Sequence, residues 1–577
     1  MNQPPTPPTE PTPQDWSLRT VRWLFWSAVT LHCLLWILGP VLLFPNLALD
    51  TLEMLVVGQN WVPASYKHPA LPGWIVDVIF RLTGSVDFAP YIAAQLATVL
   101  AVWGIWALLS RCFSRRTAVL GAIATLGCFA LGLFNFKYDN LTFMRTFWVL
   151  SALSLLLAVE ENRWYHWTLC GVFLAGGLSC HFLTGLLILA ILVYMTADTT
   201  ARKYWKTPGP YLSTAVCALL MLPLFFWILR NGFSQYTYAM GSFEKGLGGP
   251  LTHVLYPLRF LGTQLLLCCT TLLPLLPLTG FHWHWNWKGL WSTPAQRLVT
   301  TLMFLPLVIE LVLCAISGSK LPNRLGSGFV LFFPTWVFCV VLCRQDETAY
   351  RRGVWLGFVN ILLIFSFYLV GTLFVASKTS HLFYPGKELA RCVESAWKSQ
   401  TDAPLLFVRG DNWPASCVNA YHPNRPRVWS TLWTDEETFR KTGGMLLWIE
   451  PADESAAVAT HQPATHQPET EAAAEPATPS TQAITTEPAN QPDVPPTGEP
   501  TDQPTEPLQP TAEPLQRPCS LTDWYGQDCF YTDGQEVPTE WLARFPNAKI
   551  LPPVTLTSSR AKTHPVKVGM AFVPPAE

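Results

Sequence analysis

The chain carries a succession of apolar runs, each about as long as a membrane is thick. A membrane-spanning helix needs about 20 apolar residues, and such runs recur between residues 20 and 376. Over the whole chain 50% of the residues are hydrophobic and 13% are charged, roughly half the charged fraction of a soluble domain. The sequence therefore predicts an all-α polytopic membrane protein over residues 15–376.

We predict about eleven spanning helices. They cover residues 21–44, 88–110, 117–135, 142–159, 166–180, 182–197, 211–230, 255–279, 298–316, 326–343 and 354–376. The pair within 166–197 is short for two spans, so one long tilted helix with a re-entrant piece is the alternative. The first run is too long for the apolar core of a signal peptide, and we expect it to be retained as a helix.

The distribution of Lys and Arg in the short loops predicts the orientation. With the N-terminus inside, the inside loops hold the basic clusters Arg111–Arg116, Arg202–Lys206 and Arg344–Arg352, and the outside loops hold fewer basic residues. An odd number of spans then places the C-terminal region outside. Dropping one helix within 166–197 would put the Arg344–Arg352 cluster outside, which favours two spans there.

The region after residue 376 predicts a small α/β extracytoplasmic domain in two parts, residues 377–450 and 519–577. Its expected elements are a helix over Lys387–Lys398 and strands over Pro404–Val408, Met445–Ile449, Ile550–Leu556 and Val566–Val573. The intervening residues 451–518 are rich in Pro, Thr, Glu and Gln and cannot bury enough apolar surface to fold. We expect them to be disordered, together with the Pro-rich cytoplasmic residues 1–14.

Cysteines fall into two groups. Eleven of the 15 lie between Cys33 and Cys343, in or beside apolar runs, where cysteine usually acts as a small buried hydrophobe. The other four lie in the tail without the C-x-x-C spacing of zinc ligands, and an even number outside the cell membrane suggests disulfides. Because each pair is local in sequence, we predict the bonds Cys392–Cys417 and Cys519–Cys529.

Ionisable residues gather in the loops on the predicted outside face, although such residues are costly at membrane depth and usually mark function. The first outside loop holds Asp50 and Glu53, whose i, i+3 spacing puts both on one helix face, followed by Lys67 and His68. A solvated interfacial helix would also explain this loop. Further candidates on the same side are Lys137, Asp139, His181, Lys320 and Arg324.

This mixture of charges suits the cleavage of a sugar–phosphate bond. Carboxylates serve as general bases, while Lys, Arg and His neutralise a leaving phosphate. A transporter would instead place ionisable residues near the membrane midplane, where the sequence has only Glu310. The formal net charge of −1 says nothing about nucleic acid, and none of the basic clusters in the loops suggests such a partner. A non-catalytic membrane protein that handles lipid-linked glycans, a flippase or an assembly scaffold, remains the alternative.

Several short motifs resemble the GT-C glycosyltransferases, in particular the bacterial branch related to protein O-mannosyltransferases and lipid A aminoarabinose transferases (glycosyltransferase family 39). The resemblance lies in these segments: Asp50-Thr51-Leu52-Glu53, Tyr66-Lys67-His68-Pro69, Phe136-Lys137-Tyr138-Asp139, Gly177-Leu178-Ser179-Cys180-His181, Ser317-Gly318-Ser319-Lys320-Leu321, Val408-Arg409-Gly410-Asp411-Asn412-Trp413 and Tyr421-His422-Pro423-Asn424-Arg425-Pro426. Three positions depart from the family pattern: Ala70 replaces Pro, His181 replaces Lys, and the first-loop acids are spaced D-x-x-E instead of adjacent.

The resemblance implies a GT-C fold and an inverting hexosyl- or pentosyltransferase of the bacterial inner membrane, with a periplasmic C-terminal domain. The donor would be a polyprenyl-phosphate sugar, and the acceptor would be lipid A, a glycan or a protein. No cofactor is specified, which leaves room for a divalent metal.

Within this scheme each charged residue has an expected role. We assign the catalytic carboxylate to Asp50, with Glu53 and Asp139 completing the acidic side. We assign the donor phosphate to Lys67 and His68, assisted by His181, Lys320 and Arg324.

Reporter fusions test the predicted orientation. A fusion at Ala201 should read cytoplasmic and a fusion at Ser395 extracytoplasmic, because an odd number of spans separates the N-terminus from the tail. If both reporters lie on the same side, the eleven-span arrangement is wrong.

Overall fold

The computed structural model describes residues 15–576, apart from 242–248, 281–282, 342, 345, 376–380, 431–435, 451–538 and 558–565. The segments predicted to be disordered, residues 1–14 and 451–518, lie outside the described residues. So do Cys519 and Cys529, whose predicted bond is therefore not described.

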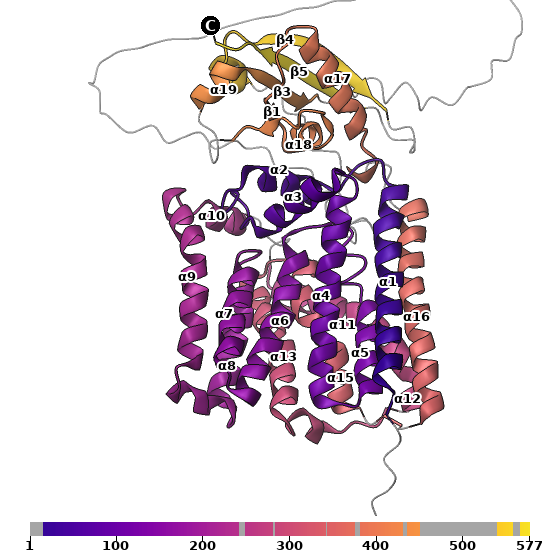
Figure 1. Ribbon diagram of the computed structural model, residues 1–577. Coiled ribbons are helices and arrows are strands. Elements are labelled where there is room, and N and C mark those ends of the chain that lie inside the picture. The colour runs from indigo at the N-terminus through magenta and orange to yellow at the C-terminus, as the bar shows by residue number, and fades with distance from the viewer. Residues whose placement is uncertain are drawn as a thin grey trace, which may run out of the picture. The chain divides into compact units, whose positions relative to one another are not determined.

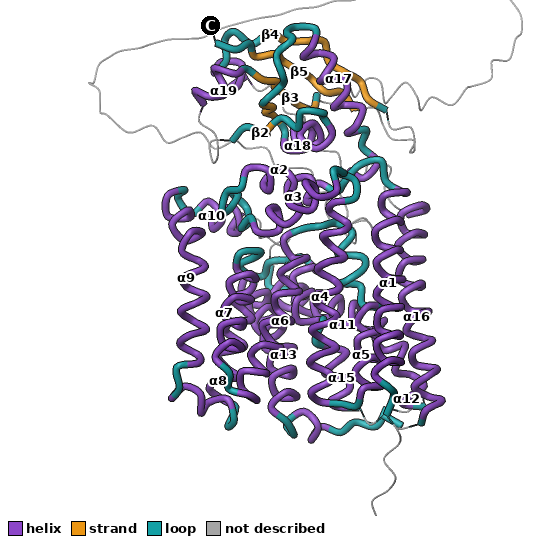
Figure 2. Tube along the Cα trace, in the orientation of Figure 1, coloured by secondary structure: helices purple, strands orange, loops and turns teal. Residues whose placement is uncertain are grey.

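Helices make up the described chain up to residue 375 (Figures 1 and 2). In chain order they are α1 (Leu18–Leu43), α2 (Leu49–Asn60), α3 (Leu71–Thr83), α4 (Ala89–Cys112), α5 (Arg115–Leu126), α6 (Asn140–Glu161), α7 (Trp164–Leu178), α8 (Thr184–Ala197), α9 (Gly209–Arg230), α10 (Ser234–Gly241), α11 (Thr252–Cys269), α12 (Leu276–Thr279), α13 (Pro294–Ser317), α14 (Ser327–Val330), α15 (Phe333–Val340) and α16 (Glu347–Val370).

Seven helical segments among the described residues are long and apolar enough to cross a membrane. They are Leu18–Leu43, Ala89–Cys112, Asn140–Glu161, Gly209–Arg230, Thr252–Thr279, Pro294–Ser317 and Glu347–Phe374. The other predicted spans fall on the shorter helices α5, α7, α8 and α14–α15. Two separate helices do occupy residues 166–197, as predicted, whereas the total number of spans stays a prediction.

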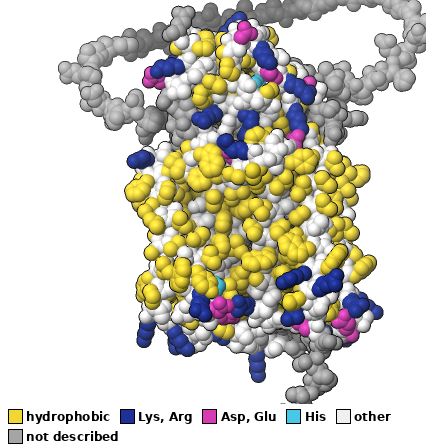
Figure 3. All heavy atoms as spheres, viewed as in Figure 1, with side chains coloured by type: hydrophobic (Ala, Val, Ile, Leu, Met, Phe, Trp, Pro, Cys, Tyr) yellow, Lys and Arg dark blue, Asp and Glu magenta, His cyan; other side chains and the backbone are white. Residues whose placement is uncertain are grey.

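Large apolar side chains cover the outer surface of these helices. Leu42 is 70% exposed, Ile316 73% and Leu219 66%, and in the view of Figure 3 hydrophobic side chains form a broad band over the helical part, with charged groups gathered at its ends. Because such a surface would be costly in water, it indicates a lipid-facing surface. The predicted polytopic membrane protein is confirmed at this level.

The tail forms one mixed sheet with flanking helices. Its elements are α17 (Gly386–Lys398), β1 (Phe407–Gly410), α18 (Asn412–Tyr421), β2 (Arg427–Val428), α19 (Glu436–Thr442), β3 (Gly444–Ile449), α21 (Thr539–Arg544), β4 (Lys549–Leu556) and β5 (Val566–Val573). The strand order is β2-β1-β3-β5-β4. The first three strands are parallel, as expected for strands joined through helices, while β5 and β4 join antiparallel. The small α/β domain predicted from sequence is therefore present.

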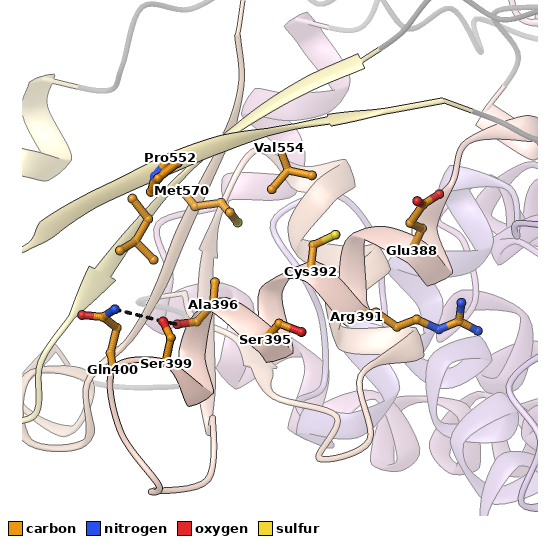
Figure 4. A pocket seen from close by; sticks show the side chains of 11 residues that line it. Glu388, Arg391, Cys392, Ser395, Ala396, Ser399, Gln400, Pro552, Val554 and Met570 are labelled. Atoms are coloured by element: carbon orange, nitrogen blue, oxygen red, sulfur yellow. Dashed lines mark hydrogen bonds between the residues drawn. The ribbon is translucent and has the colours of Figure 1, made fainter.

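The predicted bond between Cys392 and Cys417 is wrong, because both residues are free thiols. Cys417 is buried on α18, and its Sγ lies 3.8 Å from Nδ2 of Asn46. Cys392 faces instead a groove between α17 and the strands β4 and β5, where Val554 and Met570 line the opposite side (Figure 4). Proximity along the chain could not show that the two side chains point to different neighbours.

Two glycines set the close approach of α2 and α3, the helices of the first outside loop. A Cβ on Gly58 would overlap the carbonyl oxygen of Gly73, and a Cβ on Gly73 would lie 2.9 Å from the carbonyl oxygen of Met54. The contacting atoms are backbone, so a side chain could be accommodated only by moving one helix. The position of α2, which carries Asp50 and Glu53, therefore depends on these glycines.

The substitution Gly58→Ala should separate α2 from α3 and destabilise the protein by about 1–3 kcal/mol, the usual cost of overpacking. The matched control is Gly185→Ala on α8, where a Cβ would meet no heavy atom within 4 Å. Thermal unfolding of the purified proteins in detergent should show a lowered midpoint for the first variant alone. Equal midpoints for the two variants would contradict the packing argument.

Candidate active site

Arg324 joins two carboxylates from distant parts of the chain. It lies in a 3-10 helix, Asn323–Gly326, whose Asn323 carbonyl accepts a 3.0 Å hydrogen bond from Gln264 of α11. One guanidinium nitrogen lies 2.7 Å from Oδ2 of Asp50 and 3.4 Å from Oδ2 of Asp139. The sequence placed these three residues on one side of the membrane, and the structure brings them into contact.

Exposure separates the two carboxylates. The side chain of Asp50 is 37% exposed and that of Arg324 45%, whereas Asp139 is 10% exposed. Asp139 also caps α6, because its Oδ1 accepts hydrogen bonds from the backbone nitrogens of Leu141 (3.0 Å) and Thr142 (3.1 Å). Asp139 thus caps the start of α6 and contacts one side of Arg324. Asp50 and the guanidinium of Arg324 remain accessible to a substrate.

Glu53 and Lys67 form the second ion pair of the site. The Lys67 ammonium lies 2.5 Å from Oε1 of Glu53, and both side chains are largely buried, at 18% and 13% exposed. Glu53 follows Asp50 by three residues on α2, so the two acids share one side of that helix as predicted. The same Oε1 atom also accepts a hydrogen bond from the side-chain amide of Asn412, in the tail.

The two predicted histidines come together beside these pairs. The rings of His68 and His181 have centroids 4.9 Å apart. Asn140 explains their proximity, because its side-chain amide donates to the carbonyls of both Pro69 and Cys180, each at 3.0 Å. One buried amide at the start of α6 therefore ties together the loops that carry the two histidines.

The acids titrate differently because their neighbours differ. Burial would raise the pKa of Asp50, but Arg324, then Lys137 and Lys67, lower it to about 2. Burial raises the pKa of Glu53 above its ordinary value despite the opposing charge of Lys67. Burial likewise raises the pKa of Asp139, against the effects of Arg324 and Arg145. Asp50 is therefore the most firmly ionised of the three.

Both histidines have a pKa below the ordinary value of the imidazole group. Burial and the nearby His181 and Arg324 hold the pKa of His68 well below its ordinary value. Burial and Arg324 lower that of His181 to about 4. A neutral imidazole donates a hydrogen bond but supplies no positive charge, so the cationic part of the site rests on other residues.

Two of the predicted cations, Lys67 and Arg324, are paired with acids of the site. Burial opposes the charge of Lys67, but Glu53 raises the lysine pKa above its ordinary value. Asp50 above all raises the pKa of Arg324. Lys320 is half-buried in the loop between α13 and the Arg324 helix.

A metal ion does not fit the acidic residues as they are arranged. Within the described part of the chain, no three His, Cys, Asp or Glu side chains gather closely enough to hold one. Arg324 instead occupies the position between Asp50 and Asp139.

Sequence reasoning missed two residues of the site. Asn412 lies in a segment that was noted only because it resembles a family motif. The distance along the sequence between Asn412 and Glu53 gave no sign that the two residues are in contact. Tyr238 comes from α10, and its ring centroid lies 5.6 Å from the Lys67 ammonium and 5.8 Å from that of His68. The short helix α10 is held in place by Gln235, which donates a 2.5 Å hydrogen bond to the carbonyl of Ser65.

Comparisons with known proteins find a family model and solved structures that are similar to this chain. Residues 67–227 match the family model described as dolichyl-phosphate-mannose-protein mannosyltransferase. The structure is similar to that of ArnT from Cupriavidus metallidurans bound to undecaprenyl phosphate, with a TM-score of 0.54 and 14% identity over 77% of this chain and 95% of that one. The apo form of the same protein gives a TM-score of 0.52 at the same identity and coverage. No curated protein matches the chain.

The fold is that of the GT-C glycosyltransferases. Over residues 67–227 the chain is also similar to the mannosyltransferase family model, and its long apolar helices indicate a multi-pass membrane protein.

The dual contacts of Asp139 predict a difference between two substitutions. Asp139→Asn keeps a side-chain oxygen at the N-cap of α6, whereas Asp139→Ala removes the cap and should cost about 1 kcal/mol. Thermal unfolding in detergent should therefore place the Asn variant near the wild type and the Ala variant lower. Equal loss in both variants would show that the negative charge of Asp139, and not its cap, supports the fold.

Proposed function

We propose that the protein transfers a sugar from a polyprenyl-phosphate-linked donor to an envelope acceptor on the periplasmic face of a bacterial inner membrane. The observation that carries the proposal is the accessible pair of Asp50 and Arg324, in contact at 2.7 Å. It offers a base and a phosphate-binding cation at one place. The undecaprenyl phosphate bound to the structurally similar ArnT supports the donor class.

In the proposed inverting reaction the acceptor hydroxyl attacks the anomeric carbon from the side opposite the phosphate. The new bond forms as the bond from that carbon to the phosphate oxygen breaks, and Asp50 takes the hydroxyl proton. The departing phosphate gains negative charge, so cations directed at it act mainly in the transition state. Arg324, Lys67 and Lys320 supply that charge, while His68 and His181 donate hydrogen bonds.

Arg324 also couples donor binding to the basicity of Asp50. With Arg324 beside it, Asp50 has a pKa of about 2, which makes it a weak base near neutral pH. A donor phosphate that binds Arg324 places a competing negative charge there, and the pKa of Asp50 rises. The carboxylate therefore becomes a better base when the donor is present.

The acceptor and the sugar are to be found by experiment. Mass spectrometry of lipid A, envelope glycans and secreted proteins, with and without the gene, should reveal one class that loses a sugar. If none of the three classes changes, the proposed transfer is contradicted.

Asp50→Asn should reduce transfer by roughly 10²–10⁴-fold, as removal of a general base does, while the variant still inserts and binds donor. A purified assay with polyprenyl-phosphate sugar measures the rate. An acceptor that is itself a phosphate needs no base, and Asp50→Asn would then be milder than Asp50→Ala. Near-normal transfer by Asp50→Ala would move the role to Glu53 or Asp139.

Lys320→Ala provides the contrast within the same assay. Loss of a cation that binds the donor should raise the KM for donor and change kcat less at saturating donor. A loss confined to kcat would instead place Lys320 at the reacting atoms.

A further inference from the structure

One helix of the tail domain lies along the helix that carries both first-loop acids. Contacts between α18 and α2, with the residues before α2, join Asn46 to Cys417, the Leu47 nitrogen to Tyr421, Glu53 to Asn412, and Gln59 to Asn419. Gln59 also donates a 2.8 Å hydrogen bond to the carbonyl of Arg425. The tail is thus fixed to α2 from one end to the other.

Only one of these contacts reaches an acid of the site. The Asn412 amide donates to Oε1 of Glu53, the oxygen that also pairs with Lys67 at 2.5 Å. Asn412 stands at the first position of α18, where the helix backbone fixes its direction. The remaining contacts hold the domain without touching an acid or a cation of the site.

We propose that Asn412 is a positioning residue, through which the tail domain completes the active site by fixing Glu53 and its partner Lys67. The inference rests on the proposed glycosyl transfer. Without the amide, Glu53 keeps one partner and Lys67 is held by a carboxylate that is itself free to turn. The tail domain is then part of the catalytic machinery and not only an appendage of the membrane domain.

The proposal predicts a change in pH dependence. The titratable groups that act on Glu53 are Lys67, Asp50 and Tyr66, and α18 contributes the uncharged Asn412. A hydrogen bond to the charged form of a carboxyl lowers its pKa, so its loss raises the pKa of Glu53. The ionised Glu53–Lys67 pair then persists only at higher pH, and the acid limb of the activity profile shifts upward.

The test compares variants of the full-length protein in the purified transfer assay. Asn412→Ala should shift the acid limb of kcat upward by about one pH unit. Asn412→Asp should shift it further, because it sets a second carboxylate beside Glu53. Asn412→Gln keeps the donor group and should restore most of the wild-type profile.

The matched control is Asn419→Ala, which breaks the contact of the same helix with Gln59 and leaves Glu53 untouched. It should lower the thermal midpoint without moving the acid limb. Unchanged profiles in both Asn412→Ala and Asn412→Asp, or an equal shift in Asn419→Ala, would overturn the proposal. Failure of the proposed function itself is distinct, because the wild type would then show no transfer, or Asp50→Ala would transfer normally. If the Asn412→Ala variant does not fold, the pH profile of the isosteric Asn412→Asp variant tests the proposal by itself.

Discussion

The ion contacts of Arg324 hold the site together. Three segments that are far apart in sequence meet at this guanidinium, which lies 2.7 Å from Asp50 and 3.4 Å from Asp139. Either carboxylate alone would be costly to bury without a partner. Because Asp139 is largely enclosed and Asp50 is open, the arginine is anchored on one side and available on the other. A phosphate can therefore approach a cation whose position is already fixed.

Packing of the first outside loop determines the position of Asp50, the accessible carboxylate that pairs with Arg324. The glycines Gly58 and Gly73 let α2 and α3 approach at backbone distance. Thr51 then donates a 3.1 Å hydrogen bond to the carbonyl of Tyr138, which links α2 to the residue before Asp139. The tail helix α18 contacts the outer side of α2. The two acids on α2 are thus positioned by the membrane part and by the tail together.

Much of the fold could be predicted from the sequence because its strongest constraint is local. Apolar runs of about 20 residues predict spanning helices. The positive charges downstream of His181 favoured two short helices around that residue over one long helix, and the structure has two. The strands Ile550–Leu556 and Val566–Val573 also lie where their patterns placed them. A disulfide between Cys392 and Cys417 was wrong, because side-chain direction within a packed domain depends on tertiary contacts.

The site was predictable in composition and not in arrangement. Loop positions alone predicted that Asp50, Asp139 and Arg324 lie on the same side of the membrane, because all loops on one side share one aqueous surface. Which acid pairs with which cation depends on distances between segments, and no spacing rule supplies them. The partnership of Asn412 with Glu53 is of this kind, because 359 positions separate the two residues.

The proposed reaction depends on Arg324, which binds the phosphate of the donor. Native mass spectrometry of the purified protein with undecaprenyl phosphate measures this binding without any need to know the acceptor or the sugar. We expect Arg324→Ala to weaken binding by roughly ten-fold or more, the scale of a lost charge-assisted hydrogen bond, and Gly185→Ala to leave it unchanged. Equal binding by the wild type and Arg324→Ala would show that Arg324 does not hold the donor phosphate.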